Sequence, residues 1–485
     1  MHILLASLPY FDNRFHVQKE MQSGIGYKLF RSGNLNNKKK IYPICDLLYA
    51  ASLLRKNNFS VSIDDDQFRE SLEFNSYFLD LSKKNKVPDI VFIRTSLPTI
   101  KSDVDVLIQL KKKWKKTKFI VFGPVFASND ILEFIKQKKI YDGIITSEIE
   151  SVILKIVKNE KNIPGFYFKK NKKYFIQNKE VTYTEMDKLP PPAYDLVDYK
   201  KIEKLIIQTQ RGCPVGCAYC PYYLSQKNKF RAKRPETVIK ELIYLKKRFN
   251  IKRIVIHDPI LSLDKKRLTA ICNRIIEESL DIEWECETHL AHIDSELLLL
   301  MRKAGCVLTA FGVESANEKV LTNVNRRFKK WDVAKQIITL CKKIGISTRG
   351  YFILGLPEDN IKGSFATIKL AKFLGLDFAS FNLPIPIPGT LPYNQGLDMG
   401  VLDKNEKINK PDLFFDKISI HHDGNDISLS KNISQKQLKY IFRVANHYTT
   451  LFKTKGLIQK MIKFLKISIY VIFILFNEIL KKLKI

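Results

Sequence analysis

The chain has 485 residues, 45% of them hydrophobic, and a formal net charge of +32 at pH 7. This length and apolar content are typical of a globular protein with about three domains. The eight cysteines are neither paired nor dense along the chain, which suits a reducing cytosol and argues against a disulfide-bonded secreted protein. The lysines are spread along the whole chain, so we attribute the charge to composition and do not expect nucleic acid as a partner.

Short apolar runs alternate with helical patterns over residues 1–165. Residues 1–8 lack the basic segment and cleavage site of a signal peptide and predict a buried strand. Further strands are predicted at 59–63, 89–93, 119–122 and 143–145, with helices at 43–54, 104–114 and 148–157. The alternation predicts a doubly wound, Rossmann-like parallel sheet, whose ligands bind beyond the carboxyl ends of the strands.

Small or polar residues follow three of these strands. Such residues allow a ligand to approach the backbone closely, but they also make tight turns between strand and helix, and both interpretations stay open. The residues concerned are Thr95, Ser96, Gly123, Pro124 and Ser147.

Residues 166–200 predict a connection between two domains. Alternating runs at 166–168 and 174–176, separated by a lysine-rich turn, predict a hairpin. Three consecutive prolines at 190–192 then predict a stiff, extended linker.

Three cysteines, Cys213, Cys217 and Cys220, lie within eight positions after a predicted strand at 205–207. The stretch around them is rich in Gly and Pro and cannot form the interior of a helix. A tetrahedral zinc site usually needs a second ligand pair, and none follows. Thiolates also hold iron–sulfur clusters, where three ligands would leave one iron of a four-iron cluster open. Three structural cysteines in a tight turn are the plainer alternative.

Six strand–helix repeats are predicted over residues 201–395. The strands cover 205–207, 253–256, 282–286, 307–311, 348–354 and 378–381, with helices between them. This pattern predicts an incomplete, TIM-like (β/α)6 barrel with its chemistry at the carboxyl ends of the strands. Four other cysteines lie on apolar faces and are expected in the core, namely Cys272, Cys286, Cys306 and Cys341.

The Cys-x3-Cys-x2-Cys spacing, with Tyr219 before the third cysteine, resembles the radical S-adenosylmethionine (SAM) enzymes. The resemblance implies that Cys213, Cys217 and Cys220 hold a 4Fe–4S cluster whose open iron chelates SAM. One electron then cleaves SAM, and a 5′-deoxyadenosyl radical abstracts hydrogen from the substrate. It also implies an electron donor such as flavodoxin or ferredoxin.

Motifs at the strand ends match the same family. The resemblance implies that SAM is contacted by Tyr219, Asp258, Glu314, Ser315, Ile353 and Gly355. Pro388 belongs to a Pro-x-Pro-Gly-Thr turn that would lie over the barrel mouth. Thr288-His289 departs from the pattern, since an arginine is usual there. His289 would either contact substrate or cofactor, or simply bond to the backbone.

Residues 1–165 resemble the cobalamin-binding domain that precedes many of these enzymes, through residues 42–51, 88–91, 123–124 and 147–150. Two departures are a single glycine at Gly123 and the loss of both glycines from a Gly-Glu-Gly-Glu run at 147–150. No histidine motif for a lower cobalt ligand is present. The resemblance implies that this domain can bind cobalamin as a cofactor, through contacts from Thr95, Ser96, Gly123, Pro124, Ser147 and Glu148.

Residues 396–485 predict a C-terminal helical region. Ser434 and Gln437 form a capping-box pattern that opens a helix over 435–452. His421-His422-Asp423 lies in a polar loop without further ligands, and we expect it to be solvated. The apolar run 467–476, flanked by lysines, is shorter than the about 20 residues needed to span a bilayer. It either lies on an anionic membrane surface or docks on the barrel.

The sequence therefore predicts an α/β enzyme in four parts: a cobalamin-binding-like domain (1–165), a hairpin and linker (166–200), a radical SAM partial barrel (201–395) and a helical extension (396–485). The expected function is cobalamin-dependent radical methyl transfer to an unactivated atom. The alternatives are a radical rearrangement, cyclisation or oxidation without cobalamin, and a non-catalytic iron–sulfur or zinc protein. We expect a cytoplasmic protein, with membrane association through the tail as an open alternative.

Overall fold

The computed structural model describes residues 1–8, 15–19, 27–31, 43–65, 87–409 and 427–451, with single positions 41, 68, 414, 469 and 472. The chain divides into two compact units. The first comprises Met1–Pro214, Pro221–Pro259 and Glu277–Ile282, and the second comprises Val215–Cys220, Ile260–Ile276 and Glu283–Ile485. The four-part division expected from the sequence stays a prediction.

A seven-stranded sheet forms the centre of the first unit, in the order β4-β1-β5-β6-β7-β8-β9. Its parallel strands are β1 (His2–Ser7), β4 (Ser60–Asp65), β5 (Ile90–Arg94), β6 (Lys118–Phe122) and β7 (Gly143–Ile145). The antiparallel strands β8 (Phe166–Lys170) and β9 (Lys173–Ile176) complete one edge, so the predicted hairpin is confirmed. The order reverses at β1, which is the switch point where ligands bind in doubly wound sheets.

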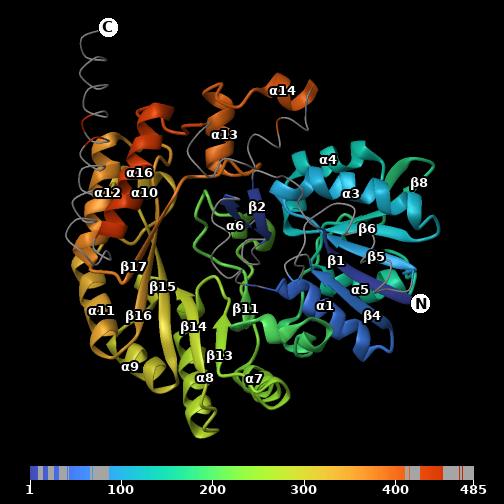
Figure 1. Ribbon diagram of the computed structural model, residues 1–485, viewed down its shortest axis with the longest axis horizontal. Coiled ribbons are helices and arrows are strands. Elements are labelled where there is room, and N and C mark those ends of the chain that lie inside the picture. Colours follow the sequence, from blue (N-terminus) through green and yellow to red (C-terminus); the bar gives the residue numbers. More distant parts are fainter. Residues whose placement is uncertain are drawn as a thin grey trace. The chain divides into compact units, whose positions relative to one another are not determined.

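Helices cover both faces of this sheet. Helices α1 (Cys45–Lys56) and α5 (Ile149–Val157) lie on one face, and α3 (Ile100–Lys113) and α4 (Asn129–Lys138) lie on the other (Figure 1). All five residues of β5 are buried, as a strand between two helical layers requires. The predicted Rossmann-like domain is therefore confirmed.

The first unit also holds the strands that precede and follow the cysteine loop. Strand β10 (Leu205–Ile207) pairs in parallel with β13 (Arg253–Ile256). The short β11 (Gln210–Arg211) and β12 (Arg231–Ala232) pair antiparallel. Between them lies α6 (Pro221–Gln226), and α7 (Pro235–Phe249) begins at its proline, which suits a first helical turn.

The second unit contains the parallel strands β14 (Glu283–Thr288), β15 (Cys306–Glu314), β16 (Ser347–Ile353) and β17 (Phe378–Asn382). The helices that alternate with them are α8 (Lys265–Glu277), α9 (Ser295–Lys303), α11 (Trp331–Lys343) and α12 (Ile361–Leu374). The strand order β10-β13-β14-β15-β16-β17 follows the chain and is that of the predicted six-stranded partial barrel. Shorter helices are α10 (Glu318–Asn323), α13 (Leu391–Asp398) and α14 (Lys404–Asn409).

Helix α16 (Gln435–Leu451) ends the continuously described part and packs against α12 and β17. The predicted capping box is present: Gln437 N donates to Ser434 Oγ at 3.3 Å, and Ser434 N donates to Gln437 Oε1 at 2.9 Å. The loop at 421–423 lies outside the described residues, as does the apolar run 467–476 apart from Ile469 and Ile472. None of the helices in the described ranges is both long and apolar enough to cross a membrane.

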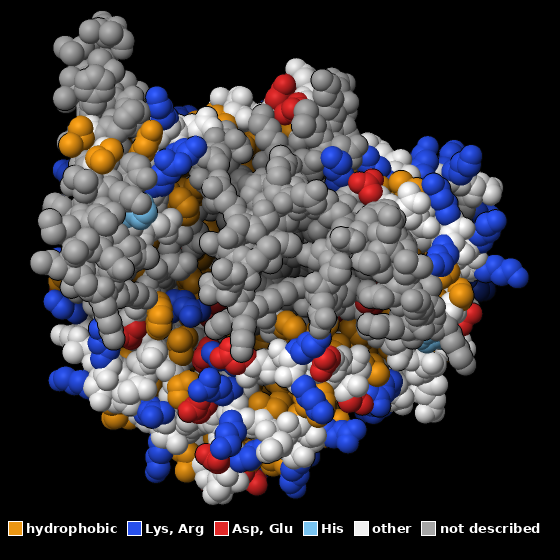
Figure 2. Space-filling view, viewed as in Figure 1, with side chains coloured by type: hydrophobic (Ala, Val, Ile, Leu, Met, Phe, Trp, Pro, Cys, Tyr) orange, Lys and Arg blue, Asp and Glu red, His pale blue; other side chains and the backbone are white. Residues whose placement is uncertain are grey.

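One further ribbon is formed by β2 (Phe15–Lys19) and β3 (Tyr27–Arg31), which pair antiparallel. On the described surface in Figure 2, Lys and Arg side chains lie interspersed with acidic and apolar ones. This distribution agrees with the attribution of the net charge to composition.

Candidate active site

The cysteine loop begins at a glycine that no other residue could replace without rearrangement. Gly212 has φ of +84°, and an added Cβ would lie 2.0 Å from the carbonyl oxygen of Lys229. Its N–H donates to Gln226 Oε1 at 2.7 Å. The loop therefore leaves β11 in a left-handed conformation that is fixed against the segment following α6.

The three predicted cluster ligands are not disulfide-bonded, with Cys217 buried and Cys213 and Cys220 partly exposed. Reduced cysteines supply the thiolates that hold an iron–sulfur cluster, so the chemistry of this set fits the group. Cys213 belongs to the first unit and the other two to the second. Among the described residues, no three His, Cys, Asp or Glu side chains are arranged to hold a metal ion. The ligand assignment therefore stays a prediction.

A buried arginine that the sequence analysis missed contacts Cys217. Arg326 Nη1 lies 3.7 Å from Cys217 Sγ, and Nη2 donates to the carbonyl oxygen of Gly312. Burial raises the pKa of the Cys217 thiol, and the guanidinium opposes part of that rise. Residues 324–330 match no motif, so the sequence offered no signal for Arg326.

Tyr219, Glu314 and Ile353, three of the predicted SAM contacts, lie in one region of the second unit. Tyr219 and Glu314 lie close enough to interact electrostatically, and Tyr219 and Ile353 both pack against an apolar cluster that includes Leu356. Burial raises the pKa of both Tyr219 and Glu314. Glu314 ends β15 with φ of +70°, a strained conformation of the kind found at ligand sites.

Ser315, Gly355 and Pro388 have structural contacts of their own. Ser315 Oγ accepts from Asn317 N at 3.0 Å. Gly355, with φ of +77°, donates its N–H to Asp359 Oδ2 at 3.1 Å. Pro388 is buried in a turn closed by the bond from Thr390 N to Ile387 O. Their predicted SAM contacts stay predictions.

Asp258 is fully buried at the end of β13 and serves the turn after β10. Its Oδ1 accepts from the backbone N–H groups of Thr209 and Gln210 at 2.7 and 3.0 Å, and its Oδ2 bonds to Thr209 Oγ1. These bonds give Asp258 a structural role in shaping the entry to the cysteine loop. The predicted contact with SAM is a separate matter and stays a prediction.

His289 is a buried, neutral histidine. Its Nδ1 accepts from Ala291 N at 3.0 Å, so the ring carries its proton on Nε2. Burial, together with the charge of Arg326, lowers its pKa to about 3. The backbone bond accounts for its orientation, and Nε2–H is the group that can donate to a ligand.

Four of the six predicted cobalamin contacts line one cavity in the first unit: Gly123, Pro124, Ser147 and Glu148. Gln208 and Arg211, just before the cysteine loop, line the same cavity. Thr95 and Ser96 do not line it; Thr95 Oγ1 donates to Asp103, and Ser96 Oγ bonds to Thr99. The cavity volume of about 70 Å³ is far smaller than a corrin, and the predicted cobalamin contacts stay predictions.

Two further features lie at these strand ends. An added Cβ at Gly123 would lie 2.5 Å from the carbonyl oxygen of Thr95, so the glycine keeps this turn tight. Arg94 ends β5 and is 1% exposed, yet its Nε and Nη1 make no hydrogen bond among the described residues. Asp46 lies 3.5 Å from Nε. Buried donors of this kind suit the amide and phosphate acceptors that cobalamin carries.

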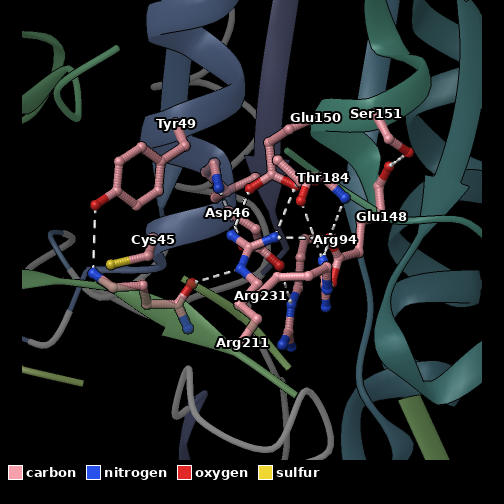
Figure 3. A network of polar contacts seen from close by, with 12 residues as sticks. Cys45, Asp46, Tyr49, Arg94, Glu148, Glu150, Ser151, Thr184, Arg211 and Arg231 are labelled. Atoms are coloured by element: carbon pink, nitrogen blue, oxygen red, sulfur yellow. Dashed lines mark hydrogen bonds and ion pairs between the residues drawn. The ribbon is translucent and has the colours of Figure 1, made fainter. Parts of the chain in front are cut away.

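An ion-pair network joins the wall of this cavity to the base of the cysteine loop (Figure 3). Arg211 binds Glu150 through both terminal nitrogens, at 2.7 and 3.2 Å, and lies 3.3 Å from Glu148. Arg231 holds Glu148 at 2.8 and 3.0 Å, and Thr184 N donates to the same carboxylate at 2.7 Å. Burial alone would raise the pKa of Glu148, but the two arginines outweigh it and lower the pKa to about 2. The predicted cobalamin contact Glu148 is therefore already paired.

The protein combines a Rossmann-like sheet with a partial barrel, and the cysteine loop follows the first strand of that barrel. Residues 207–371 match the Radical SAM superfamily. The chain is therefore an enzyme that contains a radical SAM domain, and the alternative of a non-catalytic iron–sulfur or zinc protein is set aside. Enzymes of this class work with SAM and a 4Fe–4S cluster.

Individual relatives extend the match beyond the barrel. An uncharacterised methyltransferase of Pyrococcus horikoshii is 28% identical over 72% of this chain and 77% of its own. An anaerobic magnesium-protoporphyrin IX monomethyl ester cyclase of Rubrivivax gelatinosus is 24% identical over 62% of this chain and 57% of its own. The radical SAM methyltransferase TsrM of Kitasatospora setae, solved with cobalamin and a 4Fe–4S cluster, gives a TM-score of 0.60 at 14% identity, covering 79% of this chain and 74% of its own. At this identity, the likeness to TsrM concerns the fold.

Proposed function

We propose that the protein uses SAM and a 4Fe–4S cluster to generate a 5′-deoxyadenosyl radical and transfers a methyl group, through cobalamin, to an unactivated atom of its substrate. The observation that carries the proposal is the composition of the cavity in the first unit. It is lined both by the turns predicted to hold cobalamin, at Gly123 and Ser147, and by Arg211, two positions before Cys213. When bound, the cluster supplies the electron that cleaves SAM, and cobalamin supplies the methyl group.

The chain's own residues bind and orient these groups. The thiolates of Cys213, Cys217 and Cys220 hold the cluster, and Arg211 fixes the start of their loop. The partly buried Tyr219 and the buried Glu314, which interact electrostatically, form the polar pair beside which SAM lies. His289 contributes a neutral Nε2–H donor and no acid, because its pKa is about 3.

The products of SAM test this function. The reduced, cobalamin-loaded enzyme incubated with SAM and its substrate should release both 5′-deoxyadenosine and S-adenosylhomocysteine, measured by mass spectrometry. The first product reports the radical step, and the second reports methyl transfer from SAM. An enzyme that forms neither product when it is reduced and its cluster is intact contradicts the proposal.

A second candidate is a radical rearrangement, cyclisation or oxidation in which the N-terminal domain only docks or positions the substrate. Ser147 and Ile149 stand where glycines are usual, and the described cavity is small. Side chains at such positions restrict the approach of a ligand to the backbone. Release of 5′-deoxyadenosine without S-adenosylhomocysteine would favour this candidate. An electron donor such as flavodoxin or ferredoxin serves either reaction.

The C-terminal tail bears on where the enzyme works. We propose that its apolar run, flanked by lysines, lies on an anionic membrane surface, since lysines beside an apolar helix suit that interface. In sedimentation with acidic lipid vesicles, the full chain should pellet with the vesicles. A variant that lacks residues 456–485 should stay in the soluble fraction. If the full chain and the deletion variant distribute alike, the tail docks on the protein instead.

A further inference from the structure

Arg326 belongs to a segment that holds the cysteine loop within the second unit. Ala218 N donates to the carbonyl oxygen of Val324 at 3.1 Å. Asn325 Nδ2 donates to the carbonyl oxygens of Val215 and Gly216 at 3.1 and 3.2 Å. Residues 324–326 therefore lie directly against residues 215–218, and the position of Arg326 relative to Cys217 is fixed by several bonds.

The guanidinium of Arg326 is buried and directed at sulfur. Nη1 is 3.7 Å from Cys217 Sγ, which is within the range of an N–H···S hydrogen bond. Its ion pair with Glu314 measures 3.8 Å, beyond the length of a good hydrogen bond. Gly312 leaves room for this arrangement, since an added Cβ would lie 2.7 Å from Nη2. If the guanidinium of Arg326 served only to neutralise the charge of Glu314, it would not need to contact Cys217.

We propose that Arg326 is a positioning residue that raises the reduction potential of the cluster by donating to the Cys217 sulfur. The inference rests on the cluster assignment in the proposed function. One electron from a low-potential donor adds one negative charge to the cluster, while Arg326 keeps its proton. A buried cation and an N–H···S bond stabilise that added charge, and hydrogen bonds to the sulfurs are known to set cluster potentials.

The chain offers a matched control. Arg326→Gln removes the buried charge and keeps a polar side chain, whereas Arg327→Gln removes the same charge from the adjacent, exposed position. Arg326→Lys keeps the charge but loses the planar fork that reaches both sulfur and Gly312. All three proteins would be reconstituted anaerobically with iron and sulfide, without SAM. Redox titration followed by electron paramagnetic resonance gives the midpoint potential.

Arg326→Gln should shift the midpoint to a more negative potential. The substitution removes both the buried charge and the N–H···S bond that stabilise the reduced cluster, so the ratio of reduced to oxidised cluster should fall about tenfold at a fixed potential. Arg327→Gln should stay near wild type, and Arg326→Lys should fall between the two. A full complement of iron with an unchanged midpoint in Arg326→Gln overturns the proposal.

Two further outcomes are also decisive. If Arg326→Gln fails to retain iron, the midpoint of Arg326→Lys decides, because an unchanged value overturns the proposal and a lower one supports it. If wild-type protein takes up no cluster, the proposed function fails and this inference fails with it. If the wild-type protein takes up a normal cluster and substituting Arg326 leaves the midpoint potential unchanged, this inference is refuted and the proposed function stands.

Discussion

Replacing Cys217 with alanine should reduce 5′-deoxyadenosine formation to background. A four-iron cluster held by three thiolates has no spare protein ligand, so the loss of one removes the site at which SAM is cleaved. Cys217 is also the buried member of the three. The measurement is 5′-deoxyadenosine released from the reduced protein with SAM, together with iron content.

A core cysteine supplies the control for this substitution. Cys341 is fully buried on α11 and lies outside the loop. Cys341→Ala should leave iron content and 5′-deoxyadenosine formation near wild type, at the cost of a small loss of packing. Continued 5′-deoxyadenosine formation by Cys217→Ala would rule out the cluster assignment, and with it both radical functions considered above.

Replacing Arg211 with alanine should destabilise the first unit by about 3–5 kcal/mol. The substitution leaves the carboxylate of Glu150, whose side chain is 1% exposed, buried without the guanidinium that binds it. Breaking one side of a buried pair costs this much because the remaining charge keeps its desolvation penalty. Urea unfolding of the apoprotein, followed by circular dichroism, measures the change.

Two comparisons separate this effect from general damage. Arg234 is 74% exposed and pairs with Asp187, so Arg234→Ala should cost at most about 1 kcal/mol. The double variant Arg211→Met, Glu150→Leu should recover most of the loss, because it removes both charges while Glu148 keeps Arg231. An Arg211→Ala protein within 1 kcal/mol of wild type would show that water reaches Glu150 and that the network is not a dry ion pair.

Local patterns in the sequence predicted most of the fold. Buried parallel strands read as continuous apolar runs, and the helices between them carry a regular apolar face, so both sheets could be predicted. The capping box at Ser434 and the hairpin at 166–176 also have local signals. The short ribbon β11–β12 does not, because two-residue strands have no periodicity to detect.

The site was predicted less completely, because its partners are distant in sequence. Gly123 and Ser147 do lie together at one cavity, as expected from the carboxyl ends of parallel strands. The pairing of Glu148 and Glu150 with Arg211 and Arg231 joins residues more than 60 positions apart, and charge alone does not predict it. Arg94 likewise could not be predicted as a site residue, because the burial and the incomplete hydrogen bonding of its guanidinium are properties of the folded chain.

The most direct test of the account is the corrinoid content of the protein. It should be purified anaerobically from cells that can import cobalamin, and the bound corrinoid should be quantified by mass spectrometry against protein. Methyl transfer predicts close to one corrinoid per chain. A protein with an intact cluster that cleaves SAM but holds no corrinoid would contradict cobalamin-dependent methyl transfer and would leave the N-terminal domain as a scaffold for another radical reaction.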